Sequence, residues 1–162
     1  MASLDGNAIV YCEGFFGTTN GKTAHGLIRR TRRYDVVGLV DSRHAGKDAG
    51  MVLDGRHYGI PTYASLDDAV MASDMAGRPA KYFVNGITPD GGRVSPETRA
   101  AAKHALELGL NVDSGAHDFL SDDRELAELA RKKGLRIRDV RKTPGRNELH
   151  FFSGKIEEVK CL

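Results

Sequence analysis

The segment from Ala8 to Arg33 constrains the fold more than any other, because it combines a buried strand, a glycine-rich turn and an amphipathic helix. Its apolar run over residues 8–12 is typical of a parallel strand that is covered on both faces. The apolar positions after the turn recur at the spacing of a helix. This order predicts the first unit of an α/β nucleotide-binding domain.

The turn between this strand and helix is suited to a small anionic ligand. A helix N-terminus offers free N–H groups and the positive end of the helix dipole, and Lys22 adds a cation that the dipole disfavours without an anionic partner. We expect a helix cap at Thr19 or Asn20, and the glycines at positions 14, 17 and 21 permit a positive φ in the turn. The residues predicted to line this site are Gly14, Gly17, Thr18, Thr19, Gly21, Lys22 and Thr23.

The spacing of the glycines matches neither standard phosphate-binding motif. The glycines fall as G-x-x-G-x-x-x-G, whereas the dinucleotide fingerprint is G-x-G-x-x-G. Gly21-Lys22-Thr23 resembles the end of a P-loop, but that motif has one more residue between its glycines than Gly17 and Gly21 enclose. The turn therefore predicts the fold and leaves the identity of the ligand open.

A second buried strand is predicted over residues 35–41. Its last residue, Asp41, lies about 20 residues after the glycine-rich turn, where a dinucleotide-binding domain places a ribose-binding carboxylate. The alternative is that Asp41 caps the following turn. Ser42 and Arg43 are placed to meet a 2′-phosphate, so this segment does not distinguish NAD from NADP. We expect residues 45–58 to form a mobile loop beside the site.

The rest of the chain continues to alternate strands and helices. Strands are predicted over residues 60–63, 81–87, 110–114 and 135–141, the first at a sheet edge because Pro61 lacks an N–H. Helices are predicted to begin at Ser65, Ser95 and Ser121. The pattern predicts an α/β fold, a Rossmann-like three-layer sandwich with a mostly parallel sheet, over residues 1–145.

Two further loops follow the carboxyl ends of predicted strands and complete the candidate site. Asn85 and Gly86 are expected to face the glycine-rich turn across a crevice. Ser114 and Gly115 precede His117, which we interpret as a proton acceptor. The alternative is that His117 and its neighbour only cap the turn before the next helix.

Composition narrows the class of protein. The 162 residues, 40% hydrophobic and 28% charged, suffice for one buried core. A net charge of +2 does not indicate nucleic-acid binding. The two cysteines and six histidines show no disulfide or metal-ligand spacing, and neither a membrane span nor a signal peptide is recognised. We expect a cytoplasmic protein without metal, nucleic acid or membrane partners. Four arginines are expected at the C-terminus of the first helix, where their positive charges complement the negative end of the helix dipole: Arg29, Arg30, Arg32 and Arg33.

Three stretches, EGFFGTTNGKTAHGLIRR, DSRHAG and NVDSGAHDFLSDDRELAELARKKGLRIRDVRK, resemble the N-terminal domain of the D-glutamate N-acetyltransferase-like family, long described as a domain of unknown function. The resemblance implies a Rossmann-like domain followed by a P-loop-like C-terminal domain, with acetyl-CoA as a cofactor through that second domain. Residues 146–162 would then be an arm or linker toward it. The matching positions are Gly21, Lys22, Thr23, Ala24, Gly26, Arg29, Asp41, Ala45, Gly46, Ser114, Gly115 and His117, whereas Ala116 departs from the larger apolar residue expected.

Three functions follow from these observations. The first is part of a D-amino-acid N-acetyltransferase, in which Lys22 holds an anionic group and His117 accepts a proton from an amine. The second is an NAD(P)-binding oxidoreductase domain with Asp41 on the ribose. The third is a non-catalytic docking module that forms a homo-oligomer. On the first hypothesis this chain folds alone but does not catalyse acetyl transfer.

Overall fold

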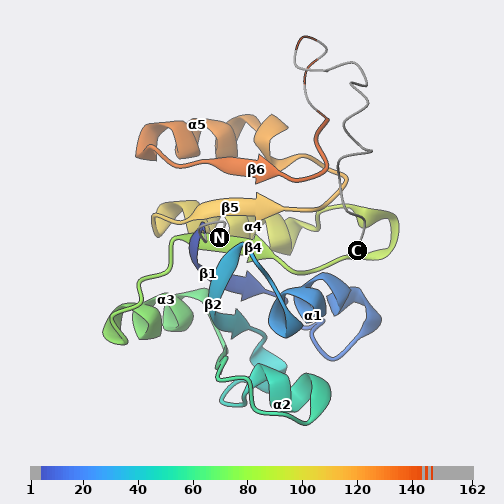
Figure 1. The fold of residues 1–162 in the computed structure, drawn as a ribbon. Helices are drawn as coiled ribbons and strands as arrows, with labels where there is room; N and C mark the ends of the chain where they lie inside the picture. Colours follow the sequence, from blue (N-terminus) through green and yellow to red (C-terminus); the bar gives the residue numbers. More distant parts are fainter. Residues whose placement is uncertain (1–4, 144, 146, 148–162) are drawn as a thin grey trace, which may run out of the picture.

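A computed structural model describes residues 5–143, 145 and 147, and its sheet confirms the predicted Rossmann-like fold (Figure 1). The six strands run in the order β3-β2-β1-β4-β5-β6, and every pair of neighbouring strands is parallel. The direction of the strand order reverses at β1, so β1 and β4 flank the topological switch point. The strands are β1 (Gly6–Tyr11), β2 (Tyr34–Val40), β3 (Thr62–Tyr63), β4 (Tyr82–Asn85), β5 (Asn111–Ser114) and β6 (Ile137–Asp139).

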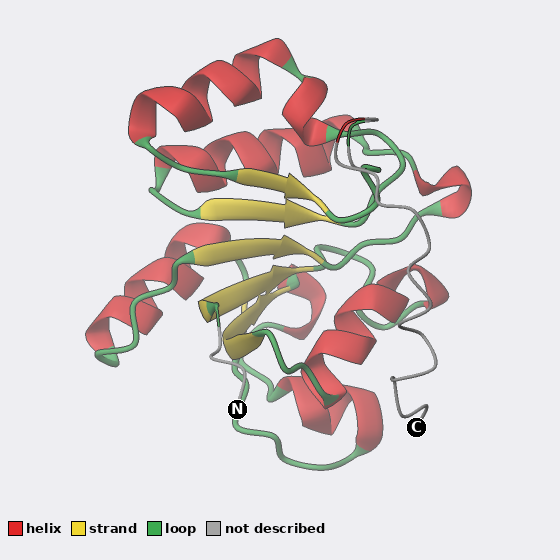
Figure 2. Cartoon of the chain, turned by 45° about the horizontal axis from the view of Figure 1, so that its top comes forward, coloured by secondary structure: helices red, strands yellow, loops and turns green. Residues whose placement is uncertain are grey.

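In the described part of the chain, five α-helices cover the two faces of the sheet (Figure 2). Because crossovers between parallel strands are right-handed, the strand order places α1 and α2 on one face and α3, α4 and α5 on the other. The helices are α1 (Lys22–Arg29), α2 (Ala49–Asp54), α3 (Leu66–Met75), α4 (Pro96–Glu107) and α5 (Arg124–Lys133).

The central strand β1 forms the middle of the hydrophobic core. Ala8, Ile9 and Val10 are fully buried, as the continuous apolar run of a strand covered on both faces predicts. The short strand β3 lies at the edge of the sheet next to Pro61, as the missing N–H of proline requires.

The helix starts follow the predicted caps with one correction. The N–H of Asp68 donates to Ser65 Oγ (3.1 Å) and that of Thr98 donates to Ser95 Oγ (3.2 Å). The last helix does not begin at Ser121, however. A short 3-10 helix, Leu120–Asp122, comes first, and the Asp123 carboxylate then caps α5. Ser121 was misassigned because this short helix continues the helical pattern of the sequence.

The prediction that residues 45–58 form a loop is wrong, because this segment contains α2. The Asp48 carboxylate accepts hydrogen bonds from the N–H groups of Met51 (3.0 Å), Tyr58 (3.0 Å) and Ile60 (2.9 Å). It therefore caps the helix and fixes the chain that returns from it. Burial alone raises the pKa of Asp48, but these backbone donors outweigh it and lower the pKa below its usual value.

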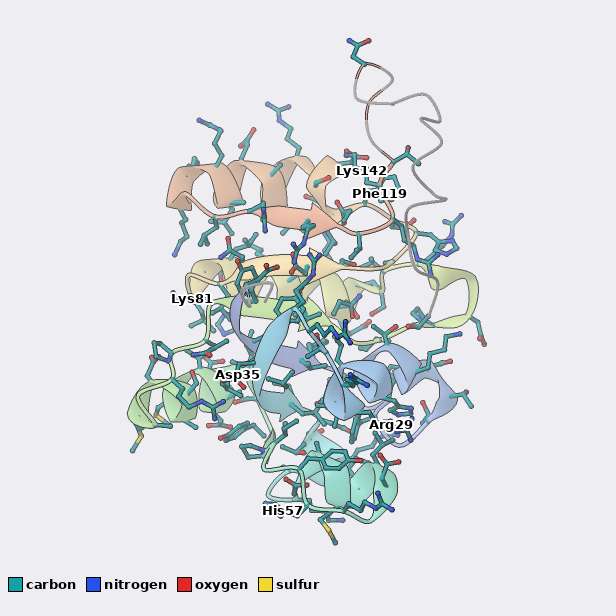
Figure 3. The ribbon with its side chains drawn as sticks, viewed as in Figure 1. Arg29, Asp35, His57, Lys81, Phe119 and Lys142 are labelled. Carbon is teal, nitrogen blue, oxygen red and sulfur yellow. The ribbon has the colours of Figure 1, made fainter. Side chains whose placement is uncertain are left out.

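The arginine at the end of α1 joins the two helices of its face. Arg29 forms a two-pronged ion pair with Asp54 at the end of α2, with its closest contact at 2.7 Å (Figure 3). Arg33 lies 3.6 Å from Asp5. Two members of the arginine cluster thus pair with carboxylates of the chain itself.

Two sequence expectations concern the ends of the chain and its environment. The predicted arm or linker over residues 146–162 lies, apart from residue 147, outside the described residues. In the part of the chain that the structure describes, no helix has both the length and the apolar composition that a membrane crossing requires.

The contact between Gly86 and α1 generates a prediction on stability. A Cβ at Gly86 would lie 2.7 Å from Ala24 Cβ and 2.9 Å from Val10 Cγ1, whereas a Cβ at Gly26 would meet nothing within 4 Å. Gly86→Ala should therefore lower the free energy of unfolding by about 1 to 3 kcal/mol. Gly26→Ala, in the middle of α1, should raise it by about 0.5 to 1 kcal/mol.

Urea denaturation of both variants measures the two changes. Equal effects of the two substitutions, or a stable Gly86→Ala variant, would show that the end of β4 and the start of α1 do not pack as closely as described.

Candidate functional site

The turn between β1 and α1 lies at the carboxyl edge of the sheet, and only one of its three glycines has the positive φ that the sequence permits. Gly14 has φ of +72°, whereas neither Gly17 nor Gly21 has a positive φ. Gly21, with φ of −85°, is required for close packing, because a Cβ there would lie 2.7 Å from the carbonyl oxygen of Phe15. A Cβ at Gly17 would lie 3.1 Å from His44 Cε1.

The start of α1 is also arranged differently. Thr18, and neither Thr19 nor Asn20, caps the short 3-10 helix Thr19–Gly21 that precedes α1, because its Oγ1 accepts a hydrogen bond from the N–H of Asn20 (3.2 Å). Gly21 then stands at the start of α1 without a side-chain cap. The N–H of Ala24 donates to the carbonyl of Gly86 (3.1 Å). Part of the donor set predicted to bind an anion is therefore already bonded within the chain.

A pocket of about 550 Å³ opens beside this turn. Lys22 contributes its ammonium group, which forms no ion pair with any residue in the described ranges. His25 Nε2 lies 2.6 Å from the carbonyl oxygen of Phe16, so Nε2 carries the proton of this hydrogen bond. The lining residues are Phe16, Gly17, Thr18, Thr19, Lys22, His25, Val52 and Leu53.

Asp41 at the end of β2 is fully buried, and the chain itself holds both of its carboxylate oxygens. Oδ1 accepts hydrogen bonds from the N–H groups of Gly14 (3.0 Å) and Arg43 (3.3 Å). Oδ2 lies 2.7 Å from His44 Nδ1. A ribose hydroxyl would have to displace one of these partners, so the geometry favours the capping interpretation.

The loop after β4 contacts the start of α1 directly through Thr88. The N–H of Thr88 donates to the carbonyl of Asn20 (2.7 Å), and Thr23 Oγ1 lies 2.5 Å from Thr88 Oγ1. Asn85 Oδ1 accepts a hydrogen bond from the N–H of Ile87 (3.1 Å). Gly86, pressed against Ala24, leaves no room for a ligand at that glycine.

The residues after β5 form a third group. Ser114 is buried, and its Oγ accepts a hydrogen bond from the N–H of Ala116 (3.2 Å). The carbonyl of Gly115 accepts one from Arg141 Nε (2.7 Å). His117 is exposed; its N–H donates to the carbonyl of Gly92 (2.7 Å), and its ring lies against that glycine.

The structure thus separates the predicted site residues. Gly17, Thr18, Thr19 and Lys22 share the pocket beside α1, whereas His117 is not among the residues that line it. Thr23, Asn85 and Gly115 line a smaller pocket of about 250 Å³ over the sheet. The sequence reasoning missed His44, although its spacing three residues after the capping Asp41 is a recognisable signal.

The parallel sheet, the helices on its two faces and the turn at its carboxyl edge define a Rossmann-like α/β domain. Residues 42–143 match the family described as "Domain of unknown function (DUF1611_N) Rossmann-like domain", and the chain belongs to this family. A DUF1611 family protein from Anabaena variabilis has a crystal structure that superposes with a TM-score of 0.76 at 26% identity. The match covers 99% of this chain and 43% of that chain.

Two curated relatives carry the name D-glutamate N-acetyltransferase. The protein from Tritonibacter scottomollicae is 33% identical over 107 residues, which are 65% of this chain and 30% of that protein. The protein from a Pseudoalteromonas species is 36% identical over 62 residues, which are 38% of this chain and 19% of the relative. The matched segments therefore span under one third of each curated relative.

The contacts of Asp41 predict a structural effect of its removal. Asp41→Ala should lower the free energy of unfolding by about 2 kcal/mol or more without any ligand, because buried donors lose a charged acceptor. Asp74→Ala is the control, since Asp74 is exposed and makes no side-chain hydrogen bond with a described residue. Thermal and urea unfolding measure both. An Asp41→Ala variant as stable as the parent would contradict this structural role and favour a role of Asp41 in ligand binding.

Proposed function

We propose that this chain is the Rossmann-like part of a D-amino-acid N-acetyltransferase, and that the pocket beside α1 binds a carboxylate of the acceptor. The observation that carries the proposal is Lys22, an ammonium group without a partner among the described residues, in a pocket beside the glycine-rich turn. The activity and the substrate in this proposal are taken from the curated relatives, which are named D-glutamate N-acetyltransferase.

The size and lining of the pocket support a small acidic ligand. Its volume of about 550 Å³ lies in the range of small-molecule sites. The hydroxyl groups of Thr18 and Thr19 and the cation of Lys22 suit a carboxylate, while Val52 and Leu53 of α2 suit a short carbon chain.

Acyl transfer also needs a donor site, which we assign to a P-loop-like C-terminal domain. The amine and the thioester carbonyl must be held about 3 to 3.5 Å apart before attack. We propose that acetyl-CoA binds in the second domain and that His117, whose ring makes no hydrogen bond with a described residue, accepts the proton of the attacking amine.

The NAD(P) alternative requires a carboxylate that is free to bind a ribose. Asp41 is placed for this role in the sequence, but in the structure its oxygens are bonded to Gly14, Arg43 and His44. The acceptor-binding proposal needs no such displacement, and we therefore prefer it.

Calorimetric titration of the chain with D-glutamate, acetyl-CoA, NAD and NADP separates these functions. We expect D-glutamate to bind, and Lys22→Ala to weaken it by about tenfold or more because a charge-assisted hydrogen bond is lost. Lys132→Ala, an exposed lysine on α5, should leave the affinity unchanged. Micromolar binding of NAD would favour the oxidoreductase function, and no binding of any ligand would favour a docking module.

The chain alone should fold but not transfer acetyl groups, because we assign the donor site to the second domain. The measurement is release of free CoA from acetyl-CoA with D-glutamate, at protein concentrations that detect a single turnover. Acetyl transfer that disappears in His117→Ala or Lys22→Ala would place the complete active site in this chain and contradict the proposed division of roles.

A further inference from the structure

A second pocket, of about 320 Å³, lies between the ends of β1 and β4, at the topological switch point of the sheet. The same turn lines both pockets, because Phe15 contributes to this one and Phe16 to the one that holds Lys22. The lining residues are Tyr11, Glu13, Phe15, Ile87, Pro89, Ser95, Glu97 and Thr98.

Tyr11 lines this pocket, and its hydroxyl has no hydrogen-bond partner among the described residues. The residue is 8% exposed and its ring packs on Phe83 at a centroid distance of 5.3 Å, yet its hydroxyl forms no hydrogen bond with any described residue. Tyr34 is equally buried at 7%, and its hydroxyl bonds to Asp113 and Arg138. The Tyr11 hydroxyl is therefore free to form a hydrogen bond with a ligand in the pocket.

The charges around Tyr11 define what that partner is. Glu13 is held in place by the N–H (2.8 Å) and Oγ (2.5 Å) of Ser42, and Glu97 lies in the first turn of α4. Burial raises the pKa of Tyr11 to about 12, and the carboxylates of Glu13 and Glu97 add to this shift. Among the described residues, the lining contains two carboxylates and no lysine, arginine or histidine. The field in the pocket therefore favours a cation.

We infer that this pocket binds the primary ammonium group of a small organic molecule, with Tyr11 and Glu97 as its polar contacts and with Glu13, whose carboxylate oxygens are bonded to Ser42, adding negative charge. Phe15, Ile87 and Pro89 suit the carbon atoms next to the ammonium group. A metal ion fits less well because Ca²⁺ and Mg²⁺ require six or more oxygen ligands, and no group of three potential ligands occurs in the described part of the chain. Identifying this ammonium as that of the acceptor amino acid rests on the proposed function.

The test uses butylamine and butanol, which differ in the ammonium group and carry no carboxylate for Lys22. Both are titrated into the 162-residue chain, and the amide NMR signals of Tyr11, Ile87 and Thr98 are followed. We expect butylamine to shift these signals and butanol not to. Tyr11→Phe and Glu97→Gln should each weaken butylamine by about tenfold, since each removes a contact to the cation.

Matched variants control for indirect effects. Tyr34→Phe removes a hydroxyl bonded to Asp113 and Arg138, and Glu128→Gln removes a carboxylate bonded to Arg124; neither should change butylamine binding. Tyr11→Phe keeps its ring contact and should unfold at the temperature of the parent. Equal binding of butanol, or unchanged affinity in both Tyr11→Phe and Glu97→Gln, overturns the inference.

The outcome also separates this inference from the proposed function. Butylamine binding at Tyr11 in a chain that does not bind D-glutamate would support the ammonium pocket and contradict the acetyltransferase proposal. D-glutamate binding that depends on Lys22, without any effect of butylamine on the three signals, would support the proposed function and contradict the ammonium pocket.

Discussion

The close contact between Gly86 and the start of α1 determines what the carboxyl edge of this sheet can bind. Gly86 donates its N–H to the carbonyl of Tyr11 (2.8 Å) and accepts a hydrogen bond from the N–H of Ala24 (3.1 Å). In dinucleotide-binding folds the helix N-terminus faces a pyrophosphate. Here the loop after β4 occupies part of that position. The same turn lines two separate pockets, one with Lys22 and the other with Tyr11.

Asp41 illustrates the same competition between the chain and a ligand. Its position at the end of β2 is the one that a ribose-binding carboxylate has in a dinucleotide fold. Its buried carboxylate instead joins the turn after β1 to the turn after β2, through Gly14 and His44. Sequence spacing places such a carboxylate correctly, but it does not show which donors surround it.

The fold was predictable because its signals are local, whereas the pockets depend on distant contacts. Burial of β1 and the cap at Ser65 follow from neighbouring residues. The cap of α2, from the N–H of Met51 to Asp48, is local as well, but the same carboxylate also binds donors 10 and 12 residues further along, which no local pattern shows. The pocket at Lys22 likewise includes side chains of α2, and the pocket at Tyr11 includes Glu97, which no local pattern connects to β1.

The turn between β1 and α1 separates two sites of opposite charge. On one side Lys22 is a cation without a partner among the described residues, and on the other Glu13 and Glu97 lie near the hydroxyl of Tyr11. The ammonium group of Lys22 and the carboxylates of the two glutamates would attract each other at short distance if the chain did not hold them apart. Ser42 fixes Glu13, which keeps it oriented toward its own pocket. If the acetyltransferase function proposed above is right, the carboxylate of the acceptor would lie in the pocket of Lys22 and its ammonium group in the pocket of Tyr11, each beside a group of opposite charge.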